Sequence, residues 1–308
     1  MQIKKSSLSR LAGQIPKLRD EFREQYYIFF TKICLFSKEY KNNRRAMAKI
    51  QRKIIAITNQ KGGVGKTTTA VNLSASLAAA EKKTLLVDMD PQANATSGFG
   101  ISPKEIEYSI YDALVQNVHI NDIIKSTDIP YLQVAPSKMH LVGAELEFVN
   151  VPAREYFLRK IIEPIRNNYD FIIIDCPPSL GLLTLNALTA ADGVLIPLQT
   201  EYYAMEGINQ LLNTVRLVKK KLNPKLVISG ILLTMYDARL NLAKQIIDDV
   251  KDFFTDLVYK TVIHRNVKLG EAPSYGKPVI LYDAVSTGAQ NYMCLAKEML
   301  SDEIQTAR

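Results

Sequence analysis

Short apolar segments alternate with helical patterns from Lys53 to the end of this chain. The alternation constrains the fold strongly, because parallel strands can be joined only by a long crossover, which is usually a helix. We therefore expect an α/β fold with a doubly wound, mostly parallel sheet that carries helices on both faces. In such a fold a ligand binds at the carboxyl ends of the strands.

Apolar runs and helical periodicity locate the expected elements. Strands are expected at Lys53–Thr58, Thr84–Asp88, Tyr131–Ala135, Phe171–Asp175, Gly193–Pro197, Val227–Thr234 and Leu257–Val262. Helices are expected at about Thr67–Ala80, Arg154–Asn167, Leu182–Ala190, Tyr203–Leu222, Ala243–Phe254 and Ala289–Leu300. No internal repeat or Pro/Gly-rich linker separates two halves, so we expect one domain.

The composition is that of a globular protein, because 47% of the residues are hydrophobic and 23% are charged. The longest aromatic-rich stretch, Tyr26–Phe36, contains Lys32 and is shorter than the roughly 20 apolar residues that span a bilayer. No secretory signal is evident, and three widely spaced cysteines make no disulfide framework. We expect a cytoplasmic protein with reduced thiols.

Positive charge is concentrated at the N-terminus. Residues 1–53 hold 14 Lys and Arg against 4 Asp and Glu, whereas the whole chain has a net charge of +8. We expect residues 1–46 to be a basic N-terminal extension, either disordered or the result of a misplaced start, with Met47 as the true start. The alternative is an amphipathic arm that docks on a partner or an anionic surface, with apolar residues at helical spacing: Phe22, Tyr26, Phe29, Phe30, Ile33 and Phe36.

A glycine-rich segment directly follows the first expected strand and opens the first expected helix. It consists of Lys61, Gly62, Gly63, Val64, Gly65, Lys66, Thr67 and Thr68. In this position glycines let backbone N–H groups turn onto phosphate oxygens, Lys66 neutralises phosphate charge, and Thr67 offers a hydroxyl to Mg²⁺. Gln60 stands where the strict pattern has Gly, and a chance glycine turn is the alternative, but the placement favours a nucleoside triphosphate site.

Together with two further motifs, this segment resembles the deviant Walker A ATPases, and within them the ParA/Soj partitioning proteins. The two motifs are Asp88-Met-Asp-Pro-Gln92 and Ile172-Ile-Ile-Asp-Cys-Pro-Pro-Ser179. The likeness runs from about Met47 to Glu298 and includes segments 197–207, 232–239 and 265–274. It implies a P-loop ATPase domain over residues 47–308, with ATP and Mg²⁺ as cofactors.

The resemblance gives the extra lysine, Lys61, a role in trans. In that family the corresponding lysine reaches the nucleotide of the opposite subunit, so that a dimer encloses two ATP molecules. A cation supplied in this way stabilises the charge of a loose phosphoryl-transfer transition state. Lys61, Lys66 and Asp90 are therefore the expected catalytic residues.

Aspartates follow two of the expected strands. Asp175 ends a strand, so its carboxylate emerges at the carboxyl edge and can bind Mg²⁺; a turn or cap aspartate is the alternative. Asp88 and Asp90 end the second strand. By resemblance, Asp90 orients the attacking water and Asp88 supports the Mg²⁺ shell, and the alternative is a pair of turn formers.

Base and DNA contacts are expected from the resemblance. His264 stands where the family usually has proline near the adenine, and it is either a base contact or a substituted loop residue. Met235 is a second expected base contact. Arg239 matches a position that binds DNA without sequence preference, and Lys268 falls where relatives commonly carry Arg, which keeps the charge and loses the bidentate fork.

The resemblance implies an ATP-dependent dimerising switch that binds DNA without sequence preference and hydrolyses ATP, stimulated by a ParB-type partner, to segregate chromosomal or plasmid DNA. We expect it in the cytoplasm, associated with the nucleoid. The alternative is a MinD-like regulator of division-site placement that associates with membranes. Acidic residues in the tail 297–308 argue against attraction to anionic lipid, so no stable membrane binding is expected. An iron–sulfur reductase is a third class, but it needs cluster cysteines that this chain does not supply.

Overall fold

The central sheet has the strand order β3-β4-β2-β5-β1-β6-β7. The computed structural model describes residues 53–201 and 204–306, which lie within one compact unit. The strands are β1 Lys53–Ile57, β2 Thr84–Asp88, β3 Lys125–Ser126, β4 Leu132–Ala135, β5 Phe171–Asp175, β6 Gly193–Gln199 and β7 Val227–Thr234. All neighbouring strands pair in parallel except the antiparallel pair of β3 with β4. The expected doubly wound α/β fold is confirmed.

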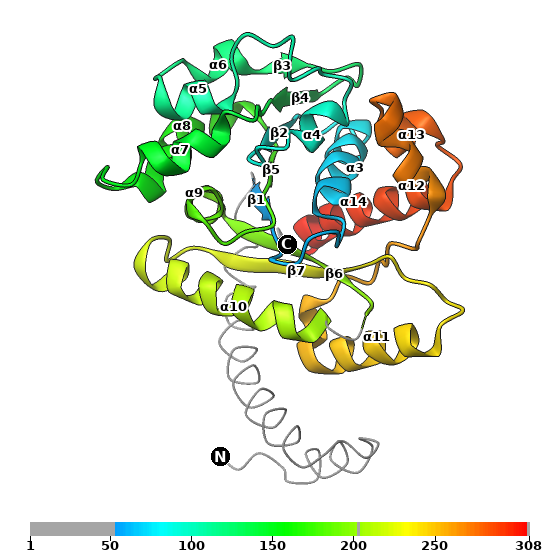
Figure 1. The fold of residues 1–308 in the computed structure, drawn as a ribbon. Coiled ribbons are helices and arrows are strands. Elements are labelled where there is room, and N and C mark those ends of the chain that lie inside the picture. The colour runs from blue at the N-terminus through cyan, green and yellow to red at the C-terminus, as the bar shows by residue number, and fades with distance from the viewer. Residues whose placement is uncertain (1–52, 202–203, 307–308) are drawn as a thin grey trace. The chain divides into compact units, whose positions relative to one another are not determined.

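Helices cover both faces of this sheet. The α-helices are α3 Lys66–Ala79, α4 Asn94–Ser97, α5 Ile110–Val115, α6 Ile120–Ile123, α7 Leu141–Glu147, α8 Phe157–Ile162, α9 Leu182–Ala190, α10 Ala204–Lys221, α11 Asn241–Phe254, α12 Val267–Glu271, α13 Val279–Tyr282 and α14 Thr287–Thr306. The 3₁₀ turns are η1 Arg154–Tyr156, η2 Glu163–Asn168, η3 Thr255–Leu257 and η4 Ala272–Tyr275. Figure 1 shows α3, α13 and α14 on one face and α8 and α9 on the other.

Burial explains why the inner strands have almost no polar residues. Every residue of β2 and β5 is buried, and the sheet packs against α3 and α14 in one apolar core. Parallel strands covered on both faces lose the alternation of apolar and polar residues that half-exposed strands have. The Tyr292 hydroxyl on α14 and the Thr69 hydroxyl on α3 lie 3.1 Å apart inside this core. The helix that follows the phosphate loop is therefore held firmly against the sheet.

The strand expected at Leu257–Val262 is wrong. Its beginning belongs to η3, and only Val258 makes an isolated bridge to β7. Glu298 on α14 takes the backbone N–H groups of Lys260 and Thr261, at 2.7 and 2.9 Å, which a sheet ladder would need. The Tyr259 and Ile263 amides still donate to the Ile231 and Leu233 carbonyls of β7, so the segment follows β7 without forming a continuous ladder.

Other expected elements differ in their extent. The helix expected at Arg154–Asn167 is divided into η1, α8 and η2, and Pro164 accounts for the change from α8 to η2. The two-residue strand β3 was not expected from the sequence. Tyr203, the expected start of α10, and residues 1–46 lie outside the described residues.

Strand order brings the three motifs together. β5 lies between β1 and β2, so the phosphate loop after β1, Asp88 at the end of β2 and Asp175 at the end of β5 emerge at one edge. The register aligns Asp175 with Asp88 on one side and with Ile57 on the other. The site expected at the carboxyl edge is therefore built by three adjacent strands.

Candidate functional site

The glycine-rich loop adopts the backbone that its sequence requires. Gly63 and Gly65 have φ angles of 73° and 85°, in the left-handed region that L side chains rarely adopt. Gly65 precedes the first residue of α3, and no side chain caps this helix. The Thr234 hydroxyl at the end of β7 donates to the Val64 carbonyl at 2.9 Å. The uncapped first turn of α3 is thus held at the sheet edge, where its amide groups can bind an anion.

Lys66 is a buried cation at the centre of this loop. Its side chain is 7% exposed, and its Nζ donates to the Lys61 carbonyl at 3.0 Å. Burial lowers the pKa of Lys66, and the nearby Asp175, Cys176 and Asp90 partly offset this effect. A buried ammonium group with a single carbonyl partner retains donors for a phosphate oxygen.

Asp175 has a fully buried carboxylate that lacks a hydrogen bond of ordinary geometry within the described part of the chain. Neither of its oxygens has a partner of ordinary geometry among the described residues. Burial raises the pKa of Asp175 well above its usual range, the charge of Asp88 raises it further, and the nearby Thr67 hydroxyl and Lys66 lower it in part. An unpaired buried carboxylate is costly and needs a function. The group that fits it is a cation.

Mg²⁺ fits this arrangement of ligands. Mg²⁺ in nucleotide sites usually takes one or two protein oxygens and fills its shell with phosphate oxygens and water. Among the described residues no group of three or more His, Cys, Asp or Glu side chains forms a ready-made metal cage. The Thr67 hydroxyl and the Asp175 carboxylate, beside an uncapped helix N-terminus, instead suit a metal that arrives with phosphate.

Asp88 differs from Asp175 because protein donors satisfy it. It accepts from the Thr96 amide at 2.8 Å, the Thr96 hydroxyl at 2.7 Å and the Asp90 amide at 3.1 Å. Burial raises the pKa of Asp88 to about 6, and these hydrogen bonds limit the rise. The Thr96 hydroxyl also accepts from the Ser137 amide at 2.9 Å. Asp88 thus holds α4 and the end of β4 in place, and its direct part in a metal shell stays a prediction.

Asp90 is nearly buried beside the same charges. It is 6% exposed, and its Oδ1 accepts only the Gln92 amide among the hydrogen bonds described here, at 2.9 Å. Its charge acts on Lys66, Asp88 and Asp175 alike. The structure therefore brings all three expected aspartates and Lys66 into one electrostatic cluster.

Lys61 pairs with a carboxylate outside the buried cluster. Its Nζ forms an ion pair with Glu201 at 3.0 Å, and the two side chains are 35% and 50% exposed. Glu201 lines a cavity of about 340 Å³ together with Met235, Arg239 and Arg265. The expected base contact Met235 and the expected DNA contact Arg239 therefore share one hollow with the partner of Lys61.

His264 lies near this region but does not line the cavity described above. Its ring packs edge-on against Tyr236 with a centroid distance of 5.3 Å, and its amide donates to Asn291 at 3.0 Å. Tyr236 and His264 form an isolated β-bridge, which brings His264 close to Met235 along the chain. A role in base binding stays a prediction for both residues.

Both expected DNA contacts are exposed cations that pair with a neighbouring carboxylate. Arg239 makes a bidentate contact with Asp237 at 2.6 and 2.9 Å, and its side chain is 86% exposed. This contact lowers the pKa of Asp237. Lys268 pairs with Glu271 at 2.9 Å and lies over the Tyr282 ring. The structure separates these two positions from the buried cluster.

Sequence reasoning missed the partners of these charges. Glu201 follows β6 and Asp237 follows β7; both lie in segments that carry the resemblance, which does not identify them as partners of Lys61 and Arg239. Thr96 lies eight residues after Asp88, within a short helix that no periodicity reveals. The Asp237–Arg239 spacing was the one local signal, because a carboxylate two residues before an arginine can reach it in a turn.

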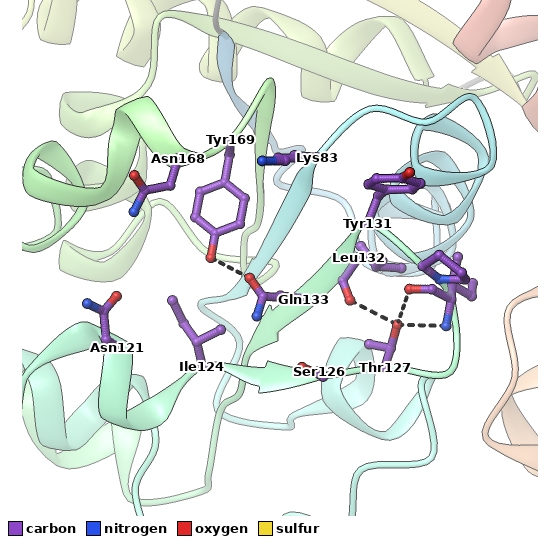
Figure 2. A pocket seen from close by; sticks show the side chains of 12 residues that line it. Lys83, Asn121, Ile124, Ser126, Thr127, Tyr131, Leu132, Gln133, Asn168 and Tyr169 are labelled. Atoms are coloured by element: carbon purple, nitrogen blue, oxygen red, sulfur yellow. Dashed lines mark hydrogen bonds between the residues drawn. The ribbon is translucent and has the colours of Figure 1, made fainter.

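A larger cavity of about 700 Å³ lies away from this cluster. Figure 2 shows its lining, which includes Lys83, Tyr131 and Tyr169, the residues just before β2, β4 and β5. The Tyr169 hydroxyl donates to Gln133 at 2.7 Å. The cavity therefore opens at the amino ends of the strands, opposite to the phosphate loop, and we assign it no part in this site.

Comparisons with known proteins agree with the motifs. A family model described as an AAA domain matches residues 52–228. The sporulation initiation inhibitor protein Soj of Bacillus subtilis (strain 168) is 61% identical over 250 residues, which cover 81% of this chain and 99% of the relative. The chromosome partitioning protein ParA of Myxococcus xanthus (strain DK1622) is 55% identical over 261 residues, which cover 85% and 92%.

A solved structure supports the fold and the type of site. The crystal structure of cobyrinic acid a,c-diamide synthase from Mycobacterium smegmatis with bound ADP and magnesium matches with a TM-score of 0.72 at 34% identity. The match covers 83% of this chain and 97% of that chain. Its fold therefore carries a nucleotide and magnesium in a protein of similar sequence.

Replacing Asp175 by Asn tests whether its buried charge destabilises the folded protein when no ligand is bound. Because the folded state keeps a proton that the unfolded chain releases, the free energy of unfolding falls as the pH rises above the ordinary pKa of 3.8. We expect Asp175→Asn to raise the Tm at pH 8 by about 2–4 °C, the shift that ~1 kcal/mol gives in a large domain. Thermal unfolding at pH 5 and pH 8 without nucleotide measures this.

The exposed Asp128→Asn is the matched control and should leave the Tm unchanged. The variant Asp175→Asn should also lose most of the extra stabilisation that ATP with Mg²⁺ gives over ATP alone. A lower Tm of Asp175→Asn at both pH values would contradict this explanation of the buried charge.

Proposed function

Because this chain belongs to the ParA/Soj family of the ParA/MinD superfamily, we propose that it is an ATP-dependent switch that segregates DNA. ATP binding closes a homodimer, the dimer binds DNA without sequence preference, and hydrolysis stimulated by a ParB-type partner releases it. The observation that carries the proposal is the unpaired buried carboxylate of Asp175, which lies with Lys66 at the uncapped end of α3.

Different residues of the buried cluster bind the nucleotide and act in its hydrolysis. The loop amides and Lys66 bind the phosphates, and Thr67 and Asp175 hold Mg²⁺ with support from Asp88. Bound Mg²⁺ neutralises phosphate charge as the terminal phosphate is transferred. Asp90 orients the attacking water, since its Oδ2 makes no hydrogen bond described here and the side chain faces the same cluster. The reaction yields ADP and phosphate, so the protein is an ATPase.

Lys61 acts on the nucleotide of the second subunit in this proposal. Its contact with Glu201 is a partly exposed ion pair, and such pairs contribute only about 0–1 kcal/mol. A triphosphate of the partner subunit can therefore replace Glu201 at little cost. The dimer then supplies each site with one cation that a single subunit lacks.

DNA binding is assigned to Arg239 and Lys268 by the same reasoning. Both carry exposed ion pairs with a neighbouring carboxylate, and a DNA phosphate can exchange for either carboxylate. Arg239 offers a phosphate the planar fork with which it now contacts Asp237, whereas Lys268 offers a point charge. Contacts of this kind position a duplex and carry no sequence information.

The division of the chain stays part of the proposal. The ATPase domain comprises residues 47–308, and residues 1–46 form a basic extension outside the described residues. The protein acts in the cytoplasm at the nucleoid. None of the helices in the described ranges is long and apolar enough to cross a membrane. A MinD-like division-site regulator remains the alternative class, and binding to liposomes of anionic lipid in the presence of ATP distinguishes it.

Asp90→Ala separates hydrolysis from binding. We expect ATP binding and the ATP-dependent dimer to persist, because Lys66, Thr67 and Asp175 are retained, while turnover falls on the order of 10²-fold or more. Phosphate release and equilibrium dialysis with ATP measure the two properties. Unchanged turnover would remove Asp90 from its proposed role.

Lys61→Ala tests the action in trans. We expect ATP to bind each subunit with little change, while the ATP-dependent dimer is lost and turnover falls on the order of 10²–10³-fold. Glu201→Gln is the matched control, because it frees Lys61 without removing the cation and should dimerise at least as well as the parent. Sedimentation with a non-hydrolysable ATP analogue measures the dimer, and a full dimer of Lys61→Ala would contradict the role.

Arg239→Glu tests the DNA assignment. We expect DNA retention with ATP to weaken and the slope of log affinity against log salt to become shallower by about 1 for each DNA phosphate that the variant no longer binds. Lys160→Glu, an equal charge change at an exposed position of α8, is the control. Retention of Arg239→Glu equal to that of the control would reject the assignment, provided both still dimerise with ATP.

A further inference from the structure

The helix α7 is apolar on two faces. Its inner face buries Leu141, Ala144 and Phe148. Its outer face and the turns on either side carry four exposed apolar side chains, Met139 (66% exposed), Val142 (50%), Leu146 (75%) and Val149 (54%), which we call the α7 stripe. A helix with apolar residues on its solvent side usually has that side covered in the working assembly.

The spacing of the α7 stripe fits a helix of another chain. Steps of three, four and three residues are those of the core positions of paired helices. Backbone hydrogen bonds at both ends, from Val142 to Met139 and from Val149 to Leu146, continue the helical path across all four residues. The stripe therefore forms one continuous seam.

The same spacing is symmetric about Ala144. When a second copy is turned by a two-fold axis, Met139 faces Val149 and Val142 faces Leu146 of the other subunit. A two-fold interface needs such a self-complementary surface, because both subunits present the same residues. The spacing is thus compatible with a second copy, and the place of α7 in the fold selects that copy as the occupant.

The position of α7 links the stripe to the nucleotide edge. The chain reaches α7 from the carboxyl end of β4, and the Ser137 amide on the way donates to Thr96, which holds Asp88. On the other side, Glu145 accepts from the Leu183 amide at 3.5 Å, at the start of the helix that follows Asp175 (Figure 1). A Cβ at Gly181 would lie against the Glu145 carboxylate, so the two segments are in close contact. The α7 segment thus contacts the chain that follows β2 and the chain that follows β5, the strands that end at Asp88 and Asp175.

We propose that the α7 stripe of one subunit packs antiparallel against the α7 stripe of the second subunit in the ATP-bound dimer. This rests on the proposed function, because it assumes that ATP brings the carboxyl edges of two subunits together. The stripe then supplies an apolar contact beside the two charged nucleotide sites. Through Ser137 and Glu145, the loops after Asp88 and Asp175 set the position of α7, so the contact depends on the nucleotide.

The first test introduces one charge into the seam. In Leu146→Glu the dimer formed with a non-hydrolysable ATP analogue and Mg²⁺ should dissociate at least tenfold more readily, while analogue binding per subunit stays unchanged. Val285→Glu, at an apolar residue that is 83% exposed outside the stripe, is the matched control and should dimerise like the parent. Sedimentation equilibrium measures the association, and fluorescence of a labelled nucleotide measures binding.

The second test reads the antiparallel register. Two single-cysteine variants, Val142→Cys and Leu146→Cys, are made in the full chain with Cys34 and Cys294 replaced by Ser, since Cys176 is buried. Mixed with the ATP analogue and a mild thiol oxidant, which accepts the two electrons and two protons, the two should form a disulfide between them, whereas the same oxidising mixture with ADP should not. This readout does not depend on a destabilising substitution.

The outcomes separate the inference from the proposed function. If the parent forms no dimer with the analogue, the proposed switch fails and the inference fails with it. If the parent dimerises but the mixed disulfide is absent and Leu146→Glu dimerises normally, the stripe is not at the subunit contact and the inference alone is overturned. If Leu146→Glu dimerises normally but loses stimulation by a ParB-type protein, the inference is overturned too. The stripe would then be a binding surface for that partner.

Discussion

The buried carboxylate of Asp175 is the constraint on which the rest of the site depends. It ends β5 between β1 and β2, in register with Asp88, and its oxygens have no hydrogen bond of ordinary geometry among the described residues. An unpaired buried charge destabilises a folded chain, so its presence calls for a functional explanation. The nearby Lys66, the uncapped α3 and the Thr67 hydroxyl complete the surroundings of a phosphate-bound cation. The buried charge of Asp175 thus destabilises the fold, and a phosphate-bound cation would offset this destabilisation.

Charges at the surface follow a different rule. Lys61, Arg239 and Lys268 each hold a carboxylate in a partly exposed ion pair that is easily exchanged. In the proposed switch, phosphates of a second nucleotide or of DNA exchange for these carboxylates. We therefore propose that the buried cluster binds the nucleotide and that the exposed ion pairs exchange partners once it has bound.

The sequence predicted those features of the fold and the site that depend on residues close together in the chain. The glycine angles, the helix after the loop and the placement of Asp175 at a strand end follow from patterns within about ten residues. The strand expected at Leu257–Val262 is wrong, since Glu298, 37 residues away from Thr261, accepts the Lys260 and Thr261 amides between two contacts with β7. The partners of Lys61 and Arg239 and the exposed side of α7 were missed for a related reason, since tertiary packing determines them. The roles given to the individual site residues remain predictions.

The most direct test of the nucleotide switch is DNA retention by the full chain with ATP and Mg²⁺, with ADP and with no nucleotide, over a series of salt concentrations. We expect retention with ATP alone, falling steeply as salt increases, because only the closed dimer presents enough cations to phosphate. Equal retention in all three states, or none in any, would contradict the switch. Equal retention would assign DNA binding to a part of the chain that does not respond to the nucleotide.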